Sequence, residues 1–178
     1  MKINKSIFLS LALVVLFITS CDLMEDPSAS VVEWKNQNIT YMTNMKDSVD
    51  YVKDTAYLTT GKEYYYYYKI TTQGNTQSTK PLSTSTVTMN YRGRLITDVV
   101  FDQTYKGNNP VNDTIAAPIT VVANTLINGV TLNLTQMHTG EIRTIILPQE
   151  LCYGKTKTGK ILSYSTLRFD IHLVSFSN

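Results

Sequence analysis

The sequence predicts an α+β domain in which several antiparallel strands surround one short helix, behind a short helical extension. From Tyr64 onward, apolar and polar residues alternate in short runs, which is the spacing of half-buried strands. Between Leu126 and Met137 the apolar residues instead recur every three or four positions, which is the spacing of a helix. Strands grouped around a single helix, with turn-forming residues between them, are typical of the α+β class.

The N-terminal stretch 1–20 has the pattern of a signal peptide. Lys2 and Lys5 precede an apolar run from Ile7 to Ile18, and small and polar residues follow it. A helix needs roughly 20 apolar residues to cross a bilayer, so this run is too short for a permanent transmembrane anchor. We therefore expect the segment to direct export.

A cysteine follows the signal peptide directly. Ile18-Thr19-Ser20-Cys21 resembles the lipobox of bacterial lipoproteins, in which the cysteine carries the lipid. We expect lipidation at Cys21, a flexible tether over 21–30, and attachment to a membrane surface of the cell envelope, on the periplasmic or the outer side. The alternative is an ordinary signal peptide, with Cys21 bonded to Cys152 in a disulfide.

The stretch 31–63 is predicted to be a helical extension in front of the main domain. Its apolar residues recur at intervals of four and seven positions, which places them on one face of a helix. These residues are Trp34, Tyr41, Met45, Val49 and Val52. We expect Trp34 to anchor the helix against its own domain, and a ligand platform is the alternative.

Five consecutive tyrosines, Tyr64 to Tyr68, predict a strand that carries rings on both faces. The alternative is an aromatic platform for a sugar or a peptide, since tyrosine suits surfaces that are partly wet. The next stretch, 71–86, is rich in Thr, Ser, Gln and Asn and contains Pro81, so it is predicted to be a loop.

The remaining elements follow in order along the chain. Strands are predicted at 87–91, with a second strand or a bulge after Gly93, and at 99–102, 118–123, 141–148 and 167–176. Turn-forming residues between 107 and 113 predict a surface loop. A helix is predicted from Asn128 or Gly129 to His138, with Gly140 as its stop signal.

Composition and motifs exclude several classes of function. The net charge of +2 is small, and the Lys and Arg residues are scattered, so a nucleic-acid surface is not expected. His138 and His172 lack a metal-ligand spacing, and Cys152 is the only thiol left after lipidation. Phosphate-binding Gly-rich loops and a nucleophile elbow are absent from the sequence. We therefore expect neither a metal nor an organic cofactor.

Stretches spread over nearly all of 64–178 resemble the FKBP-type peptidyl-prolyl cis-trans isomerases. In chain order they are Tyr-x-Gly at 91–93, Phe-Asp at 101–102, Leu-Ile-Asn-Gly at 126–129, Gly-Glu at 140–141, Pro-x-x-x-x-Tyr-Gly at 148–154 and Ser-Thr-Leu-x-Phe-Asp at 165–170. Each motif alone is weak, but the order and spacing together are specific. The resemblance implies an FKBP-like domain over 64–178, an antiparallel sheet wrapped on one short helix, in a bacterial lipoprotein form.

The resemblance also implies isomerisation of X–Pro bonds, and it assigns roles to particular residues. Rotation about such a bond is slow because the amide is conjugated, and a dry aromatic pocket can favour the twisted transition state without any nucleophile. By resemblance, Ile127 offers its backbone N–H to the substrate and Tyr153 offers its hydroxyl. The pocket would be lined by Tyr91, Phe101 and Phe169, with Asp102 at its edge and Leu126 and Ile161 completing the apolar wall.

Two departures from the family pattern bear on activity. The family usually places a tryptophan at the base of the pocket, where this chain has Val130, so the floor is smaller and less aromatic. The loop before the last strand usually carries Ile-Pro-Pro, where this chain has Ile161-Leu162-Ser163. Its rim is more basic, with Lys155, Lys157 and Lys160 nearby.

Three hypotheses of function follow. The leading one is a monomeric prolyl isomerase, lipid-anchored at the cell envelope, that acts on X–Pro bonds of exported polypeptides. The second is a catalytically weak or inactive module of the same fold that binds peptides or a protein partner, because Val130 leaves the pocket floor small. The third is a ligand- or glycan-binding lipoprotein that uses the Tyr64–Tyr68 face.

Overall fold

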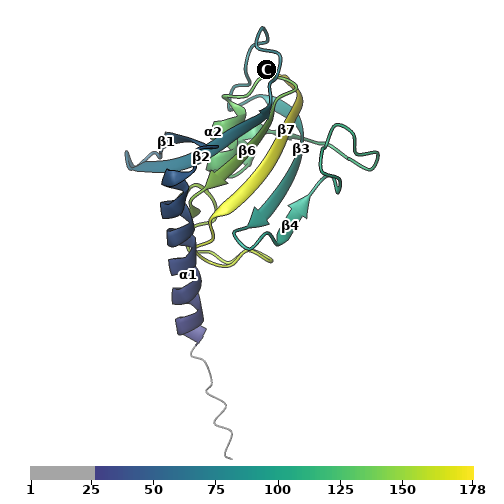
Figure 1. The fold of residues 1–178 in the computed structure, drawn as a ribbon. Coiled ribbons are helices and arrows are strands. Elements are labelled where there is room, and N and C mark those ends of the chain that lie inside the picture. The colour runs from purple at the N-terminus through teal and green to yellow at the C-terminus, as the bar shows by residue number, and fades with distance from the viewer. Residues whose placement is uncertain (1–26) are drawn as a thin grey trace, which may run out of the picture.

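The computed structural model describes residues 27–178, and its centre is one antiparallel sheet (Figure 1). The helices are α1 (Pro27–Asn44) and α2 (Asn128–Leu134), with short 3-10 turns η1 (Met45–Asp47), η2 (Ala123–Thr125) and η3 (Gln149–Leu151). The strands are β1 (Val52–Tyr57), β2 (Glu63–Thr72), β3 (Thr86–Leu95), β4 (Val100–Gln103), β5 (Ile119–Val122), β6 (Ile142–Leu147) and β7 (Leu167–Ser177). Their order in the sheet is β1-β2-β6-β7-β3-β4, with β5 also paired to β3.

The core lies between one face of this sheet and α2. Alternate residues of the two central strands β6 and β7 point into it, as the period of two along a strand requires. Val130 and Leu134 of α2 close it from the other side. Ten of its side chains are completely excluded from solvent, namely Tyr66, Val87, Ala123, Leu134, Met137, Ile145, Leu147, Leu167, Ile171 and Leu173. The predicted class, an antiparallel sheet around a short helix, is therefore confirmed.

The N-terminal extension begins with a helix, as predicted, but its bounds and its second half differ from the prediction. α1 begins at Pro27, inside the stretch expected to be a tether, and ends at Asn44. Val52, expected on the helix, starts a strand that pairs residue for residue with β2, from Val52 opposite Tyr68 to Tyr57 opposite Glu63. The extension expected to be helical over 31–63 therefore contributes an edge strand to the sheet. For this segment, pairing with β2 outweighs the helical spacing of its apolar residues. Val49, which was also expected on the buried face of the helix, is 99% exposed.

Two other boundaries move. α2 ends at Leu134 rather than at His138, because Gln136 and Met137 donate their N–H groups to carbonyls three residues back, as in a turn. After Gly93 the chain continues as the single strand β3, with a register shift against β4 between Gly93 and Arg94. The alternative of a bulged single strand is the one observed.

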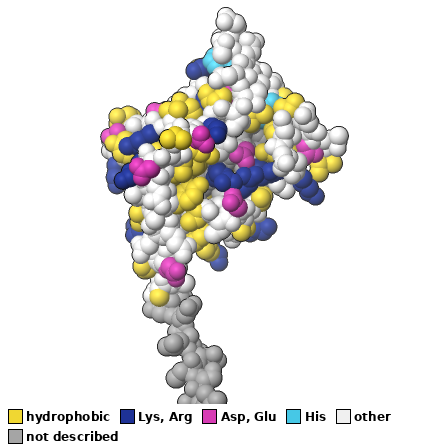
Figure 2. Space-filling model, in the orientation of Figure 1, with side chains coloured by type: hydrophobic (Ala, Val, Ile, Leu, Met, Phe, Trp, Pro, Cys, Tyr) yellow, Lys and Arg dark blue, Asp and Glu magenta, His cyan; other side chains and the backbone are white. Residues whose placement is uncertain are grey.

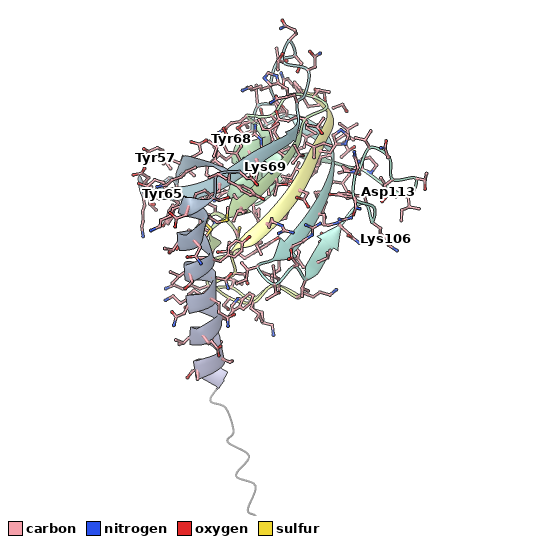
Figure 3. All side chains as sticks on the ribbon, in the orientation of Figure 1. Tyr57, Tyr65, Tyr68, Lys69, Lys106 and Asp113 are labelled. Atoms are coloured by element: carbon pink, nitrogen blue, oxygen red, sulfur yellow. The ribbon has the colours of Figure 1, made fainter. Side chains whose placement is uncertain are left out.

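The outer face of the sheet is covered in part by the loop between β4 and β5. Arg92 points to this face, is 8% exposed, and donates to the carbonyls of Tyr105 and Gly107 at 3.2 and 2.6 Å. Asp113, labelled with Lys106 in Figure 3, accepts the N–H groups of Lys106 and Gly107 and so closes the loop. These backbone hydrogen bonds, that of Gly107 first, lower the pKa of Asp113 below its ordinary value.

Charges of both signs are mixed on the face shown in Figure 2. Lys and Arg side chains lie beside Asp and Glu over the sheet, with apolar side chains between them. None of the helices within residues 27–178 is long and apolar enough to cross a bilayer. The signal peptide over 1–20 and the lipid attachment at Cys21 lie outside the described residues, as does any bond between Cys21 and Cys152.

Candidate active site

A cavity of about 320 Å³ opens between the sheet and the start of α2. Strands β3, β4 and β7 supply one side of it, and the segment from η2 into α2 supplies the other. Eight of the nine residues predicted to form the pocket line this one cavity. They are Tyr91, Phe101, Asp102, Leu126, Ile127, Val130, Tyr153 and Phe169.

A hydrogen-bonded pair stands at the edge of the cavity. The hydroxyl of Tyr91 on β3 donates to Oδ2 of Asp102 on β4 at 2.5 Å. Oδ1 of the same carboxylate accepts the backbone N–H of Gln103 at 2.9 Å, so the side chain is held from two directions. Burial, and then the hydrogen bond to Asp102, raises the pKa of Tyr91 well above its ordinary value. The hydroxyl therefore remains a donor at neutral pH.

Two phenylalanine rings form the inner wall. Phe101 on β4 and Phe169 on β7 pack edge to face, with ring centroids 5.6 Å apart and planes at 84°. They meet over Gly93 of β3, which pairs with Asp102 on one side and with Phe169 on the other. A Cβ at Gly93 would lie 2.3 Å from Cζ of Phe101, so only glycine leaves room for this contact.

The start of α2 presents an unused backbone donor to the cavity. Ile127 stands just before the helix with extended backbone angles, φ −61° and ψ 146°, and its carbonyl accepts the N–H groups of Val130 and Thr131. Its own N–H meets no acceptor within residues 27–178, as expected for the first N–H groups of a helix. Because Ile127 lines the cavity, this N–H is available to a ligand carbonyl.

Two further predicted residues form the floor and the rim of the cavity. Val130, which was expected to give the pocket a small floor, is 4% exposed and lines the base of the cavity. Tyr153 stands at the rim, 38% exposed, and burial raises the pKa of its hydroxyl, with smaller contributions from Cys152 and Asp102. Burial likewise raises the pKa of the Cys152 thiol.

Ile161 is the one predicted pocket residue that the structure places elsewhere. It is 5% exposed, belongs to the hydrophobic core, and exchanges backbone hydrogen bonds with Thr158. That short loop turns the isoleucine inward, away from the cavity. Four residues that line the cavity were not predicted. Strand alternation alone would have found two of them, because Met89 lies two positions before Tyr91 and Ile171 lies two positions after Phe169. The other two are Ile119 and Thr125.

The residues that line the cavity suit a reaction in which the substrate is bound in a particular conformation and no covalent bond is broken. The walls are mostly apolar rings and aliphatic side chains, and the polar groups that face in are hydroxyls, a carboxylate and a backbone N–H. Within residues 27–178, no three His, Cys, Asp or Glu side chains gather as metal ligands. Such a cavity can hold a compact apolar ring and hydrogen-bond the amide groups on either side of it.

Comparison with known proteins gives one family. The model of the FKBP-type peptidyl-prolyl cis-trans isomerases matches residues 77–174. The peptidyl-prolyl cis-trans isomerase Mip of Coxiella burnetii is 36% identical over 109 residues, which are 61% of this chain and 43% of that protein. The outer membrane protein MIP of Legionella longbeachae is also 36% identical over 109 residues, 61% of this chain and 42% of that protein. The chain therefore spans less than half the length of these relatives.

A solved structure agrees at the level of the fold. The crystal structure of FkpA from Escherichia coli matches with a TM-score of 0.65 and 24% identity, covering 84% of this chain and 62% of that chain. At this identity the likeness concerns the fold alone. It confirms the FKBP-like arrangement of sheet and short helix that the motifs predicted.

Proposed function

The chain belongs to the family of FKBP-type peptidyl-prolyl cis-trans isomerases, and from this premise we propose that it isomerises X–Pro bonds in polypeptides. The observation that carries the proposal is the joint placement of three features in one cavity. They are the Phe101–Phe169 wall, the Tyr91–Asp102 pair and the unused N–H of Ile127. A module that only binds peptides could use the same three features, so turnover is the measurement that separates the two functions.

The barrier that the protein must lower is rotation about a conjugated amide. This barrier is about 18–20 kcal/mol in the free peptide, and it falls when the nitrogen loses conjugation with its carbonyl. The rings of Phe101 and Phe169 can hold the proline ring while the preceding carbonyl turns out of the amide plane. In a site that excludes water, groups that meet the twisted form better than either planar form accelerate the reaction.

Two hydrogen bonds would orient the substrate chain. The Ile127 N–H can donate to one substrate carbonyl, and the Tyr153 hydroxyl at the rim can donate to another. The Tyr91 hydroxyl is already engaged by Asp102, so we assign this pair to shaping the edge of the cavity next to the turning carbonyl. No step requires a nucleophile or a cofactor.

A protease-coupled assay tests the proposal. The chain from residue 22 is mixed with a series of short X–Pro peptides, and the cis population is followed as it converts to trans. Turnover that Tyr153→Phe lowers several-fold supports the proposal, because the lost hydrogen bond contributes about 1 kcal/mol. Peptides that bind without any acceleration would point to the inactive module instead, and the small floor at Val130 is the feature that would explain such a result.

The size of the floor gives a separate prediction. Val130→Trp should raise affinity for X–Pro peptides several-fold, because about 50 Å² of added ring surface at roughly 25 cal/mol per Å² corresponds to about 1 kcal/mol. Isothermal titration with a proline-containing peptide measures it. Val130→Leu, which adds aliphatic volume without a ring, is the control for simple filling of the site. A folded Val130→Trp protein that binds no more tightly than Val130→Leu contradicts the assigned floor.

We also propose that the protein works at the cell envelope, held by a lipid on Cys21. The relative from Legionella longbeachae is named an outer membrane protein, and Cys21 follows a signal-peptide pattern in this chain. Cys21→Ser should move the protein from the membrane fraction to the soluble fraction, or leave it unprocessed, when the cells are fractionated. Cys152→Ser, which removes the other thiol, should leave its distribution unchanged. Membrane association that survives Cys21→Ser would refute the lipid anchor.

A further inference from the structure

The N-terminal helix α1 is attached to the domain by directional hydrogen bonds. Asn38 is 2% exposed and uses both ends of its amide. Its Oδ1 accepts the N–H of Thr166 at 2.7 Å, and its Nδ2 donates to the carbonyl of Trp34 at 2.8 Å. Nε1 of Trp34 in turn donates to Oγ of Ser165 at 3.0 Å. The bonds to Ser165 and Thr166 join parts of the chain more than 120 residues apart.

Apolar burial alone does not fix this helix. Val32 and Ile39 on α1 are 56% and 52% exposed, so much of its apolar surface remains in water. Hydrogen bonds to a buried amide set a position more strictly than apolar contact does, because an unpaired buried polar group is costly. The placement of α1 therefore depends on the match between Asn38 and Thr166.

The segment that α1 holds adjoins two residues of the candidate active site, Tyr153 and Phe169. Ser165 and Thr166 are each 3% exposed and end the loop that starts after η3. Ser165 Oγ donates to the carbonyl of Leu162 at 2.7 Å, so this hydroxyl joins the loop to α1. Thr166 lies three residues before Phe169, one of the two rings of the cavity wall.

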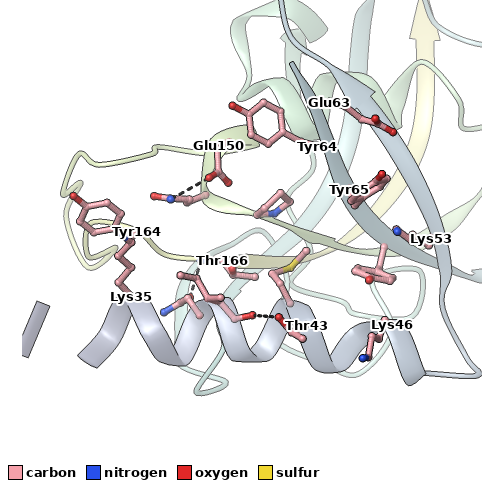
Figure 4. A pocket seen from close by; sticks show the side chains of 16 residues that line it. Lys35, Thr43, Lys46, Lys53, Glu63, Tyr64, Tyr65, Glu150, Tyr164 and Thr166 are labelled. Carbon is pink, nitrogen blue, oxygen red and sulfur yellow. Dashed lines mark hydrogen bonds between the residues drawn. The ribbon is translucent and has the colours of Figure 1, made fainter. Parts of the chain in front are cut away.

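The same segment is bonded to the backbone beside Tyr153. Tyr164 adopts a left-handed conformation, φ +65°, and its N–H donates to the carbonyl of Gly154 at 2.8 Å. Nζ of Lys35 on α1 lies 5.0 Å from the centroid of the Tyr164 ring, a cation–π contact (Figure 4). A shift of 164–166 relative to α1 would therefore move both Gly154 and the neighbouring Tyr153.

We propose that α1 is a positioning element of the isomerase, and that Asn38 and Trp34 are positioning residues that hold Tyr153 and Phe169 ready for substrate. This inference rests on the function proposed above. Neither residue lines the cavity, so both act through the loop. Without them the loop samples arrangements that do not bind substrate. The apparent affinity then falls in proportion to the fraction of molecules whose loop is in the binding arrangement. Bound substrate selects the competent arrangement, so turnover at saturation is preserved.

The test is a split between KM and kcat in the coupled assay. Asn38→Ala and Trp34→Phe should each raise KM about 3- to 10-fold and leave kcat within about twofold, as expected when the competent fraction falls to between a third and a tenth. Tyr66→Phe is the matched control, because it removes the hydrogen bonds of the Tyr66 hydroxyl with Asp54 and Gln136, which lie outside the loop and the cavity. Its KM should equal that of the parent. General loss of folded protein would lower kcat at constant KM.

Amide hydrogen exchange gives a second readout that does not need catalysis. Asn38→Ala should speed exchange of the Tyr164 and Gly154 N–H groups at least tenfold, while Tyr66→Phe leaves them as in the parent. Parental KM values in both α1 variants, or a loss confined to kcat, overturn the inference while the isomerase function stands. A parent without turnover refutes the proposed function instead. Exchange at Tyr164 and Gly154 then decides the inference, and unchanged exchange in Asn38→Ala overturns it.

Discussion

Arg143→Met is expected to lower the free energy of unfolding by about 3–5 kcal/mol, the usual effect of removing one partner from a buried ion pair. Arg143 is 4% exposed and Glu141 is 2% exposed, and Nε of the arginine lies 2.7 Å from Oε1 of the glutamate. Among the described residues, the substitution leaves the Glu141 carboxylate one hydrogen bond, from the N–H of His138 at 3.2 Å. A buried charge that keeps one hydrogen bond and loses its counter-ion is poorly compensated.

The arginine also connects three elements, which adds to the expected loss. Its Nη1 donates to Oδ1 of Asn133 on α2 at 3.4 Å, and its guanidinium carbon lies 4.7 Å from the centroid of the Tyr68 ring on β2. Chemical denaturation of Arg143→Met against the parent measures the change. A folded domain of this size should melt at least 6 °C lower, at roughly 2–4 °C per kcal/mol.

Two further variants make this prediction specific. Lys69→Met is the matched control, because Lys69 and Asp50 form an ion pair whose side chains are 40% and 66% exposed, and such pairs contribute about 0–1 kcal/mol. The double variant Glu141→Gln/Arg143→Met removes both buried charges and should recover part of the loss. If Arg143→Met is as stable as Lys69→Met, the buried pair does not have the assigned role.

Much of the site could be predicted because its residues belong to regular strands or to their ends. Tyr91 and Phe169 lie on strands whose alternation is clear in the sequence, and Phe101 and Asp102 close a short apolar run. Once the order of motifs indicates the fold, pairing of β3 with β4 and β7 brings these side chains together. The backbone donor at Ile127 follows equally from the start of a helix at the predicted place.

The failures of prediction have a common physical cause. The segment that forms β1 was expected to be helical because its apolar residues have helical spacing. That local pattern does not show that β2 offers an edge with which the segment can pair. Ile161 was placed in the cavity by motif position, whereas the turn that bonds it to Thr158 directs it into the core. The contacts of Asn38 with Thr166 join residues too far apart in sequence for any local pattern to reveal.

Gly93→Ala is expected to lower kcat/KM for X–Pro peptides at least tenfold, because the added methyl group takes the place of the Phe101 ring. The new Cβ would lie 2.3 and 2.5 Å from Cζ and Cε2 of Phe101 and 3.0 Å from Cε1 of Phe169. Contacts below 3 Å cannot persist, and Phe101 is only partly buried, so its ring is the group that moves. The edge-to-face contact with Phe169 is then lost, and the inner wall of the cavity opens.

The cost in stability should be smaller than the loss of activity. Overpacking of this kind lowers the free energy of unfolding by about 1–3 kcal/mol, and a displaced ring at the surface relieves part of the strain. Gly61→Ala is the control: nothing lies within 4 Å of its Cβ, but its φ of +74° disfavours alanine. Through backbone strain alone that change costs about 1–2 kcal/mol, without touching the cavity.

Comparison of the two glycine variants separates steric exclusion at the cavity from general destabilisation. Gly61→Ala should lose stability and keep parental kcat/KM at temperatures where it is folded, whereas Gly93→Ala should lose activity beyond what its stability accounts for. Phe101→Leu added to Gly93→Ala removes the ring that collides, so the double variant should regain stability without regaining activity. Parental kcat/KM in Gly93→Ala would show that the wall built by Phe101 and Phe169 is not where the proline ring binds, because the methyl group cannot fit while the Phe101 ring keeps its present position.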